Sequence, residues 1–106
     1  MKFENVTALP KANLYFDGRV VSHGIVTAAG EKKTFGVIFP GEYFFGTEAA
    51  ERMDVIDGTC EVVLKDSEEK KTYKAGDHFK VKANSGFTIT VAEGTAEYIC
   101  SFIEEA

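Results

Sequence analysis

The sequence predicts an all-β fold, either a small barrel or a jelly roll. Roughly nine or ten short segments rich in β-branched and aromatic residues follow one another about every eight to twelve residues, each bounded by Gly, Pro or Asp. No segment keeps a helical period. The chain has 106 residues, with neither a repeat nor a linker, which predicts one domain with one core. We divide it into an N-terminal arm, residues 1–12, and a barrel domain, residues 13–106.

The composition limits the classes of partner. Hydrophobic residues make up 44% of the chain, enough for a sizeable core, and the formal net charge is −5 with a pI near 5.0. Nucleic acids and anionic membranes require clustered Lys and Arg. The basic runs at 31–33 and 65–71 are mixed with acidic residues. We therefore expect neither nucleic acid nor a membrane as a partner.

The chain has two cysteines, Cys60 and Cys100, without the C-x-x-C spacing of zinc and redox sites. Two are too few for a disulfide scaffold, so we expect small buried hydrophobic residues. No apolar run has the length of a transmembrane helix, and the first residues lack the apolar core of a signal peptide. A reduced, cytoplasmic location is the simplest interpretation.

The N-terminal region predicts an arm followed by two strands. Residues 1–12 show little periodicity, and we interpret them as an arm that could pack on a partner. Residues 13–16 form a short apolar segment that ends at an Asp-Gly turn. Residues 19–28 are rich in β-formers, and Gly24 among them indicates a bulge or a bend.

The central stretch, between a Pro-Gly turn and an Asp-Gly turn, has the pattern of a pocket wall. An aromatic strand at 42–46 leads to a polar corner at 47–50, where one helical turn could form. The next strand alternates so that Glu51, Met53 and Val55 share one face, which we expect to point into the barrel.

Six further strands complete the prediction. At residues 33–39, alternation places Phe35, Val37 and Phe39 on one face. The other five follow Gly- or Asp-containing turns, at residues 59–64, 70–74, 78–82, 87–91 and 96–103.

Two segments resemble the motifs of the cupin fold. Glu51 and Gly58 have the spacing of the second half of the first motif. The Gly-Asp pair at 76–77, a strand, and the run 83–86 into Phe87 resemble the second motif. The chain therefore resembles a single-domain cupin, a jelly-roll β-barrel.

A longer pattern narrows the resemblance to one family. Its residues are Tyr15-Phe16-Asp17-Gly18-Arg19-Val20, Gly41-Glu42-Tyr43, Phe45, Thr47, Glu51, Met53, Val55-Ile56, Gly58, Ala75-Gly76, Tyr98 and Cys100. Together they resemble the bacterial pyrimidine/purine nucleoside phosphorylases, which are small homodimeric cupins. The resemblance implies a glycosyltransferase of the pentosyltransferase class. It would convert purine or pyrimidine nucleosides and inorganic phosphate into the free base and α-D-ribose 1-phosphate.

The chain departs from the metal-binding cupins. Those proteins carry a His-x-His pair shortly before the motif glutamate, whereas this chain has Phe-Phe-Gly-Thr at 44–47 and Phe87 at the third ligand position. Of the cupin metal-ligand positions, only the one at Glu51 still carries a possible ligand, and one carboxylate does not hold a transition metal. His23 and His78 lie outside the motif positions. We therefore expect no metal and no other cofactor.

Glu51 is the candidate catalytic residue. Cleavage at an anomeric carbon builds positive charge on the sugar ring, and a carboxylate can stabilise that charge or bind the sugar hydroxyls. The alternative is a structural carboxylate that ties down the corner at 47–50, because carboxylates in pockets can have either a functional or a structural role.

Aromatic and hydroxyl side chains around Glu51 are candidates for substrate binding. Tyr43, Phe45 and Phe87 could stack on any base, which suits broad specificity; the alternative is plain core packing. Thr47 offers a hydroxyl at the mouth, or else a corner cap. Tyr98 and Cys100 share a face of the last strand and either pack there or enter the pocket.

Phosphate requires cationic or backbone donors, and the chain has only two arginines. Arg19 follows the Asp-Gly turn in a segment of the resemblance, so we favour it as a phosphate ligand. Arg52 faces away from Glu51 and could reach a dimer interface. The alternative for either is a surface ion pair of small energetic weight.

We thus expect a nucleoside phosphorylase that binds nucleosides and inorganic phosphate and forms a homodimer. The residues by themselves predict only a small β-barrel with an aromatic, carboxylate-bearing pocket. A non-catalytic cupin that binds a metabolite as a sensor or carrier is the alternative, because a fold does not fix a function.

Overall fold

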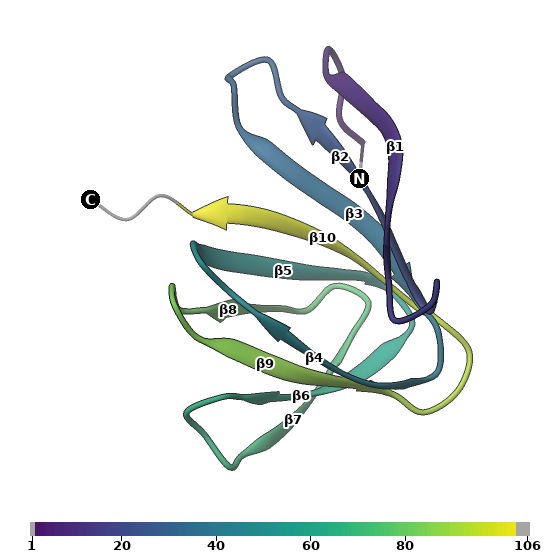
Figure 1. Ribbon diagram of the computed structural model, residues 1–106, viewed down its shortest axis with the longest axis vertical. Helices are drawn as coiled ribbons and strands as arrows, with labels where there is room; N and C mark the ends of the chain where they lie inside the picture. The colour runs from purple at the N-terminus through teal and green to yellow at the C-terminus, as the bar shows by residue number, and fades with distance from the viewer. Residues whose placement is uncertain (1, 104–106) are drawn as a thin grey trace.

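The computed structural model describes residues 2–103, which form ten β-strands and no helix (Figure 1). The strands are β1 (Thr7–Tyr15), β2 (Val20–Val26), β3 (Lys32–Ile38), β4 (Gly41–Gly46), β5 (Ala50–Asp57), β6 (Thr59–Leu64), β7 (Lys70–Lys74), β8 (His78–Val81), β9 (Gly86–Val91) and β10 (Ala96–Ile103). The all-β prediction is confirmed. Within these residues, no helix is long and apolar enough to cross a membrane.

The strands form two antiparallel sheets. The large sheet has the order β1-β2-β3-β10-β5-β8, and the small sheet has the order β4-β9-β6-β7. In Figure 1, strands β1 to β3 lie at the end of the molecule away from β6 and β7, so the small sheet covers only part of the large one. The inner faces of β2 and β3 are nevertheless buried at Val20, Ser22 and Ile38.

The core lies between the two sheets and follows from strand alternation. Met53 and Val55 of β5 are buried, whereas Arg52 is exposed and Asp54 half-buried on the other side. The predicted alternation of this strand is therefore confirmed. Strand β3 alternates as predicted too, but Phe35 is 40% exposed and Ile38 is buried. The face that carries Phe35 is thus the outer one.

Two local expectations need correction. Strand β1 begins at Thr7, well before the segment predicted at 13–16, and residues 7–15 pair with β2. A register shift between Leu9 and Asn13 interrupts the alternation of side chains, so the sequence pattern did not indicate a strand there. The corner at 47–50 contains a bend, not a helical turn. Its backbone instead bonds the turn before β9: the N–H of Thr47 donates to the carbonyl of Ser85 at 3.0 Å, and the N–H of Asn84 donates to the carbonyl of Glu48 at 3.1 Å.

The Asp-Gly turns are local features that the sequence predicts well. Gly58 has a φ of 79° and lies against the backbone of Thr95, where an added Cβ would collide with the carbonyl oxygen. Only glycine fits both conditions. The predicted polar tail at 104–106 lies outside the described residues.

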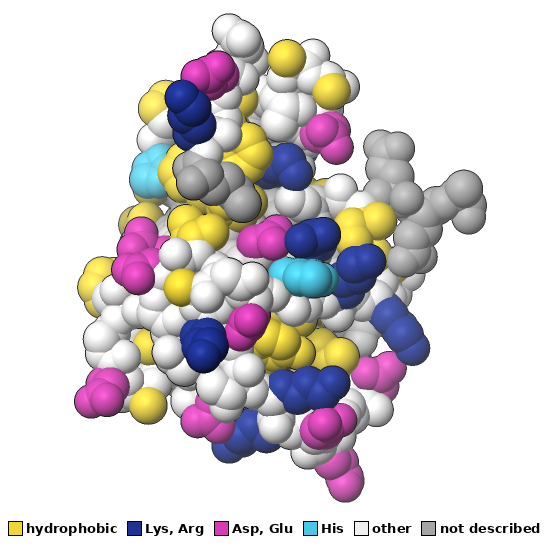
Figure 2. Space-filling view, turned by 180° about the vertical axis from the view of Figure 1, so that it is seen from behind, with side chains coloured by type: hydrophobic (Ala, Val, Ile, Leu, Met, Phe, Trp, Pro, Cys, Tyr) yellow, Lys and Arg dark blue, Asp and Glu magenta, His cyan; other side chains and the backbone are white. Residues whose placement is uncertain are grey.

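The surface matches the mixed charge of the sequence. Figure 2 shows the side of the molecule opposite to that in Figure 1, with acidic, basic and hydrophobic side chains interspersed over it. Among the described residues on that face, basic and acidic side chains alternate and no broad area of positive charge of the kind that nucleic acids select is seen.

Candidate active site

A cavity of about 250 Å³ lies between the two sheets, and we call it the inter-sheet cavity. Its lining residues are Tyr15, Ser22, Thr34, Ile38, Phe45, Gly46, Glu51, Met53, Phe87, Tyr98, Cys100 and Phe102. Pockets for drug-sized ligands span about 300–1,000 Å³. The inter-sheet cavity therefore suits a small metabolite better than a dinucleotide or a polymer.

The small sheet supplies an aromatic wall. Phe45 of β4 and Phe87 of β9 stand opposite each other in the strand register, and their rings stack with centroids 5.8 Å apart. Phe45 is half-buried and lines the cavity, whereas Phe87 is only 2% exposed. Two of the three predicted pocket aromatics are thus brought together on one wall.

Two more aromatic residues reach this wall from the last position of β1 and the turn after it. Tyr15 and Phe16 meet the Phe45 ring edge-on, with centroid distances of 5.8 and 5.5 Å. Phe16 and Asp17 have φ values of 53° and 57°, a left-handed conformation that is uncommon outside glycine. The turn therefore holds two rings at the edge of the cavity.

The large sheet supplies a polar wall opposite the rings. Its hydroxyl, carboxyl and thiol groups belong to Ser22, Thr34, Glu51, Tyr98 and Cys100. They come from four neighbouring strands, and strand alternation turns each of them inward. Ser22 is also held by Asn13, whose Nδ2 donates to the Ser22 Oγ at 3.3 Å.

Glu51 lies half-buried on the polar wall, as predicted from alternation. Burial raises the pKa of its carboxyl, and a hydrogen bond from the Cys100 thiol lowers it by a smaller amount. No ion pair joins Glu51 to a described Lys, Arg or His side chain. A thiol is a weak donor, so the carboxylate keeps most of its hydrogen-bonding capacity for a ligand.

Tyr98 and Cys100 both enter the cavity. Burial raises the pKa of Tyr98 to about 12, although a hydrogen bond with Ser22 opposes the shift. Burial and the neighbouring Glu51 also raise the pKa of Cys100. Both side chains therefore stay protonated near neutral pH and act as donors. Cys60 and Cys100 are free and buried, as predicted. Cys60 packs in the core, whereas Cys100 also lines the cavity.

Three predicted substrate ligands lie outside the cavity lining. The Tyr43 hydroxyl lies 2.8 and 2.9 Å from the carbonyl oxygens of Phe39 and Pro40, which share its proton. Thr47 is 7% exposed and bonds the backbone of the turn before β9. Arg19 is exposed. For these residues, direct contact with a substrate stays a prediction.

The sequence did not predict Tyr15, Ser22 or Thr34 as site residues, although Tyr15 belongs to the pattern of the family resemblance. Ser22 and Thr34 share the inner faces of β2 and β3 with buried apolar residues, Val20 and Ile38. A polar residue in register with buried neighbours is the signal that could have identified them.

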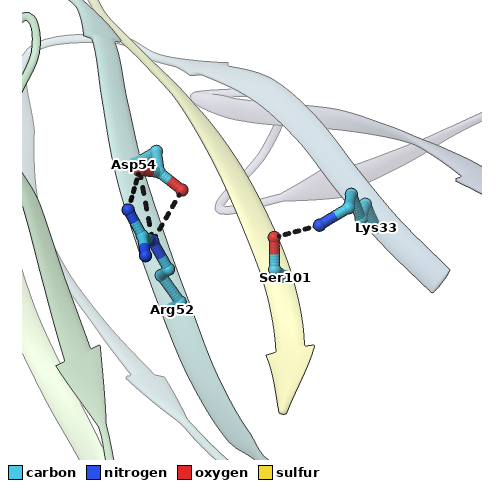
Figure 3. A network of polar contacts seen from close by, with 4 residues as sticks. All are labelled: Lys33, Arg52, Asp54 and Ser101. Atoms are coloured by element: carbon cyan, nitrogen blue, oxygen red, sulfur yellow. Dashed lines mark hydrogen bonds and ion pairs between the residues drawn. The ribbon is translucent and has the colours of Figure 1, made fainter. Parts of the chain in front are cut away.

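Arg52 and Lys33 lie on the outer face of the large sheet (Figure 3). The Arg52 Nη2 atom lies 3.2 Å from Asp54 Oδ1, and Lys33 Nζ donates to Ser101 Oγ at 2.8 Å. Both cations are thus engaged on the side of the sheet opposite to Glu51.

The cavity has few possible metal ligands. Its lining contains one carboxylate and one thiol but no histidine. Across residues 2–103, no three His, Cys, Asp or Glu side chains gather closely enough to hold a metal ion.

Comparison with known proteins places the chain in a family. A model of the pyrimidine/purine nucleoside phosphorylase family matches residues 10–102. The chain belongs to this family. A protein of Paraburkholderia xenovorans (strain LB400) with that name is 49% identical over 102 residues, which cover 96% of this chain and 95% of the relative. Its namesake in Cupriavidus metallidurans (strain ATCC 43123 / DSM 2839 / NBRC 102507 / CH34) is 50% identical over 95% of this chain and 97% of its own.

Solved structures agree with this placement. A protein of unknown function from Acinetobacter sp. ADP1 is 39% identical and superimposes with a TM-score of 0.92, over 96% of this chain and 98% of its own. The predicted fold, a single-domain jelly roll of the cupin type, is thereby confirmed, as is the predicted family.

Proposed function

We propose that this chain is a nucleoside phosphorylase that cleaves purine and pyrimidine nucleosides with inorganic phosphate. One observation carries the proposal: in a chain about half identical to proteins named for this activity, an aromatic wall faces a polar wall across one small cavity. A nucleoside has the same division, with a flat base at one end and a sugar bearing hydroxyl groups at the other.

In the proposed complex, the base stacks on Phe45 and Phe87 and the sugar lies on the polar wall. Stacking accepts any base because every base has a π-face. The rings of Phe45 and Phe87 carry no hydrogen-bonding group that would select one base edge. This arrangement supports acceptance of both purine and pyrimidine nucleosides.

In the proposed reaction, the bond from the anomeric carbon to the base nitrogen breaks and its electron pair leaves with the base. A phosphate oxygen forms the new bond to the same carbon, which gives α-D-ribose 1-phosphate. The proton that hydrogen phosphate loses is balanced by the proton that the base nitrogen gains. The enzyme would therefore be a glycosyltransferase of the pentosyltransferase class, with neither oxidant nor reductant required.

Glu51 would stabilise the positive charge that develops on the sugar ring. Its carboxylate is partly desolvated and has no described cation beside it, so a developing positive charge in the cavity would interact with it favourably. In the structural alternative, Glu51 would tie down the corner at 47–50. The Thr47 hydroxyl already ties this corner to the turn before β9, through the carbonyl of Lys82 and the N–H of Ser85.

We also propose that the chain forms a homodimer through the outer face of β1 to β3. Leu14, Val21 and Val37 pair across these strands in one row, in which Leu14 is 66% exposed and the two valines are half-buried. Exposed apolar patches of this kind mark interaction sites. Light scattering should give twice the chain mass for the wild type and the chain mass for Leu14→Lys.

We also propose a cytoplasmic location, in keeping with two free thiols.

The experiment separates the enzyme from a non-catalytic metabolite binder. Purified protein is incubated with uridine or adenosine, with and without phosphate, and the free base is quantified by chromatography. The phosphorylase releases base only when phosphate is present. Tight nucleoside binding without base release, from either nucleoside, would instead support a sensor or carrier.

A further inference from the structure

A second hollow opens beside the inter-sheet cavity, and we call it the basic hollow. It has a volume of about 350 Å³ and is lined by Leu9, Lys11, Asn13, Tyr15, Gly24, Lys32, Thr34 and Phe102. Tyr15, Thr34 and Phe102 also line the inter-sheet cavity. The two spaces therefore share a boundary.

A bulge places Lys11 in this hollow. Leu9 pairs with Gly24 and Asn13 pairs with Ser22, so a four-residue step in β1 is opposed by a two-residue step in β2. Strand β1 thus has two residues more than β2 between these pairs, and Lys11 lies at the middle of the bulge that they form. Bulges re-aim side chains and are frequent beside active sites.

Lys32 reaches the same hollow from the other side. It is the first residue of β3 and shares the inner face with Thr34. Strand β2 lies between β1 and β3 and contributes Gly24 to the lining. Because glycine has no side chain, nothing from this position of β2 fills the space between the two lysines. A Cβ at Gly24 would lie 3.2 Å from Leu9 Cδ1.

The charge of the basic hollow contrasts with that of the chain. Its lining has two ammonium groups, one amide and two hydroxyl groups, and no carboxylate. Neither Lys11 nor Lys32 forms an ion pair with a described carboxylate, whereas Lys70, Lys71 and Lys82 each do. In a protein with a net charge of −5, such a hollow attracts small anions.

We propose that the basic hollow binds the inorganic phosphate of the proposed reaction, with Lys11 and Lys32 as its cationic ligands. This inference rests on the proposed function. Phosphate there lies across the shared boundary from the sugar on the polar wall, where it can approach the anomeric carbon. Lys33 and Arg52 are poor rivals because they are engaged on the outer face of the sheet (Figure 3).

The kinetic test varies phosphate at saturating uridine. Lys11→Gln and Lys32→Gln should each raise the KM for phosphate at least about tenfold, since each removes a charged hydrogen-bond donor. The KM for uridine should change less than about twofold. Lys74→Gln makes the same charge change at an exposed site on β7 and should match the wild type. An unchanged phosphate KM in both hollow variants would overturn the proposal, and a rise in Arg19→Gln alone would move the site to Arg19.

A binding test keeps this inference separate from the proposed function. Phosphate is titrated into protein without nucleoside and followed by calorimetry. The wild type and Lys74→Gln should bind phosphate, and the Lys11→Gln/Lys32→Gln double variant should lose that binding. If the wild type binds phosphate at the basic hollow but releases no base, the proposed reaction is wrong and the proposed phosphate site is still supported. If the double variant binds phosphate as the wild type does, or the wild type binds none, the anion site is wrong.

Discussion

Thr47 Oγ1 donates a 2.6 Å hydrogen bond to the carbonyl oxygen of Lys82, and it accepts one of 3.0 Å from the N–H of Ser85. One buried hydroxyl thus joins the corner before β5 to the turn before β9. Glu51 follows this corner directly, yet no bond to the corner comes from its carboxylate. Thr47 therefore fixes the corner, and the Glu51 carboxylate faces the cavity without a bond to the corner.

Replacing Thr47 should cost stability. Thr47→Val keeps the shape but leaves the N–H of Ser85 and the carbonyl of Lys82 without this partner, which should lower the free energy of unfolding by about 1–3 kcal/mol. Urea denaturation measures the change. Thr72→Val, at an exposed site on β7, is the matched control and should stay near the wild type. Wild-type stability with a raised uridine KM in Thr47→Val would instead make Thr47 a substrate ligand.

Replacing Glu51 should stabilise the protein at neutral pH. Burial raises the pKa of this carboxyl in the folded state, so the folded protein holds its proton more tightly than the unfolded chain does. The resulting penalty is absent at a pH below the unfolded pKa, grows as the pH rises through the folded pKa, and is constant above it. Calorimetry should show a higher Tm for Glu51→Gln than for wild type at about pH 7. The difference should vanish near pH 4. A lower Tm at neutral pH would identify Glu51 as a structural residue.

Phe45 should contribute to nucleoside binding by stacking. Phe45→Leu retains an apolar side chain but removes the ring, and the loss of about 1–3 kcal/mol of stacking corresponds to at least about a fivefold rise in KM. The rise should be similar for uridine and adenosine. Phe44→Leu is the control, because Phe44 points outward from the same strand and is 50% exposed. Equal effects of the two substitutions would contradict a stacking role.

Tyr98 should ionise late in an alkaline titration. Burial raises its pKa to about 12 in the folded protein, so the fold favours the protonated phenol and loses stability as the pH rises above the ordinary pKa of about 10. Absorbance of tyrosinate against pH should show a delayed component in the wild type. That component should be missing in Tyr98→Phe. Its survival in the variant would assign it to another tyrosine.

The sequence predicted the features that depend on local chemistry. Gly and Asp turns delimit most strands, and alternation in β5 turns Glu51 inward because Met53 and Val55 are buried beside it. Alternation cannot say which face of a strand meets the second sheet, so the outer position of Phe35 required the structure. Lys11 depends on a bulge whose register is set by pairing with β2. No local pattern encodes that pairing.

The central claim is that Glu51 and the two walls around it serve phosphorolysis, and one product measurement tests it most directly. EDTA-treated protein is incubated with uridine and inorganic phosphate, and the mixture is followed by ³¹P NMR. The account predicts that α-D-ribose 1-phosphate appears in equal amount with uracil, at a rate at least about tenfold lower in Glu51→Gln, or about 1.4 kcal/mol of barrier. No sugar phosphate from the wild type, or an unchanged rate in folded Glu51→Gln, would contradict it.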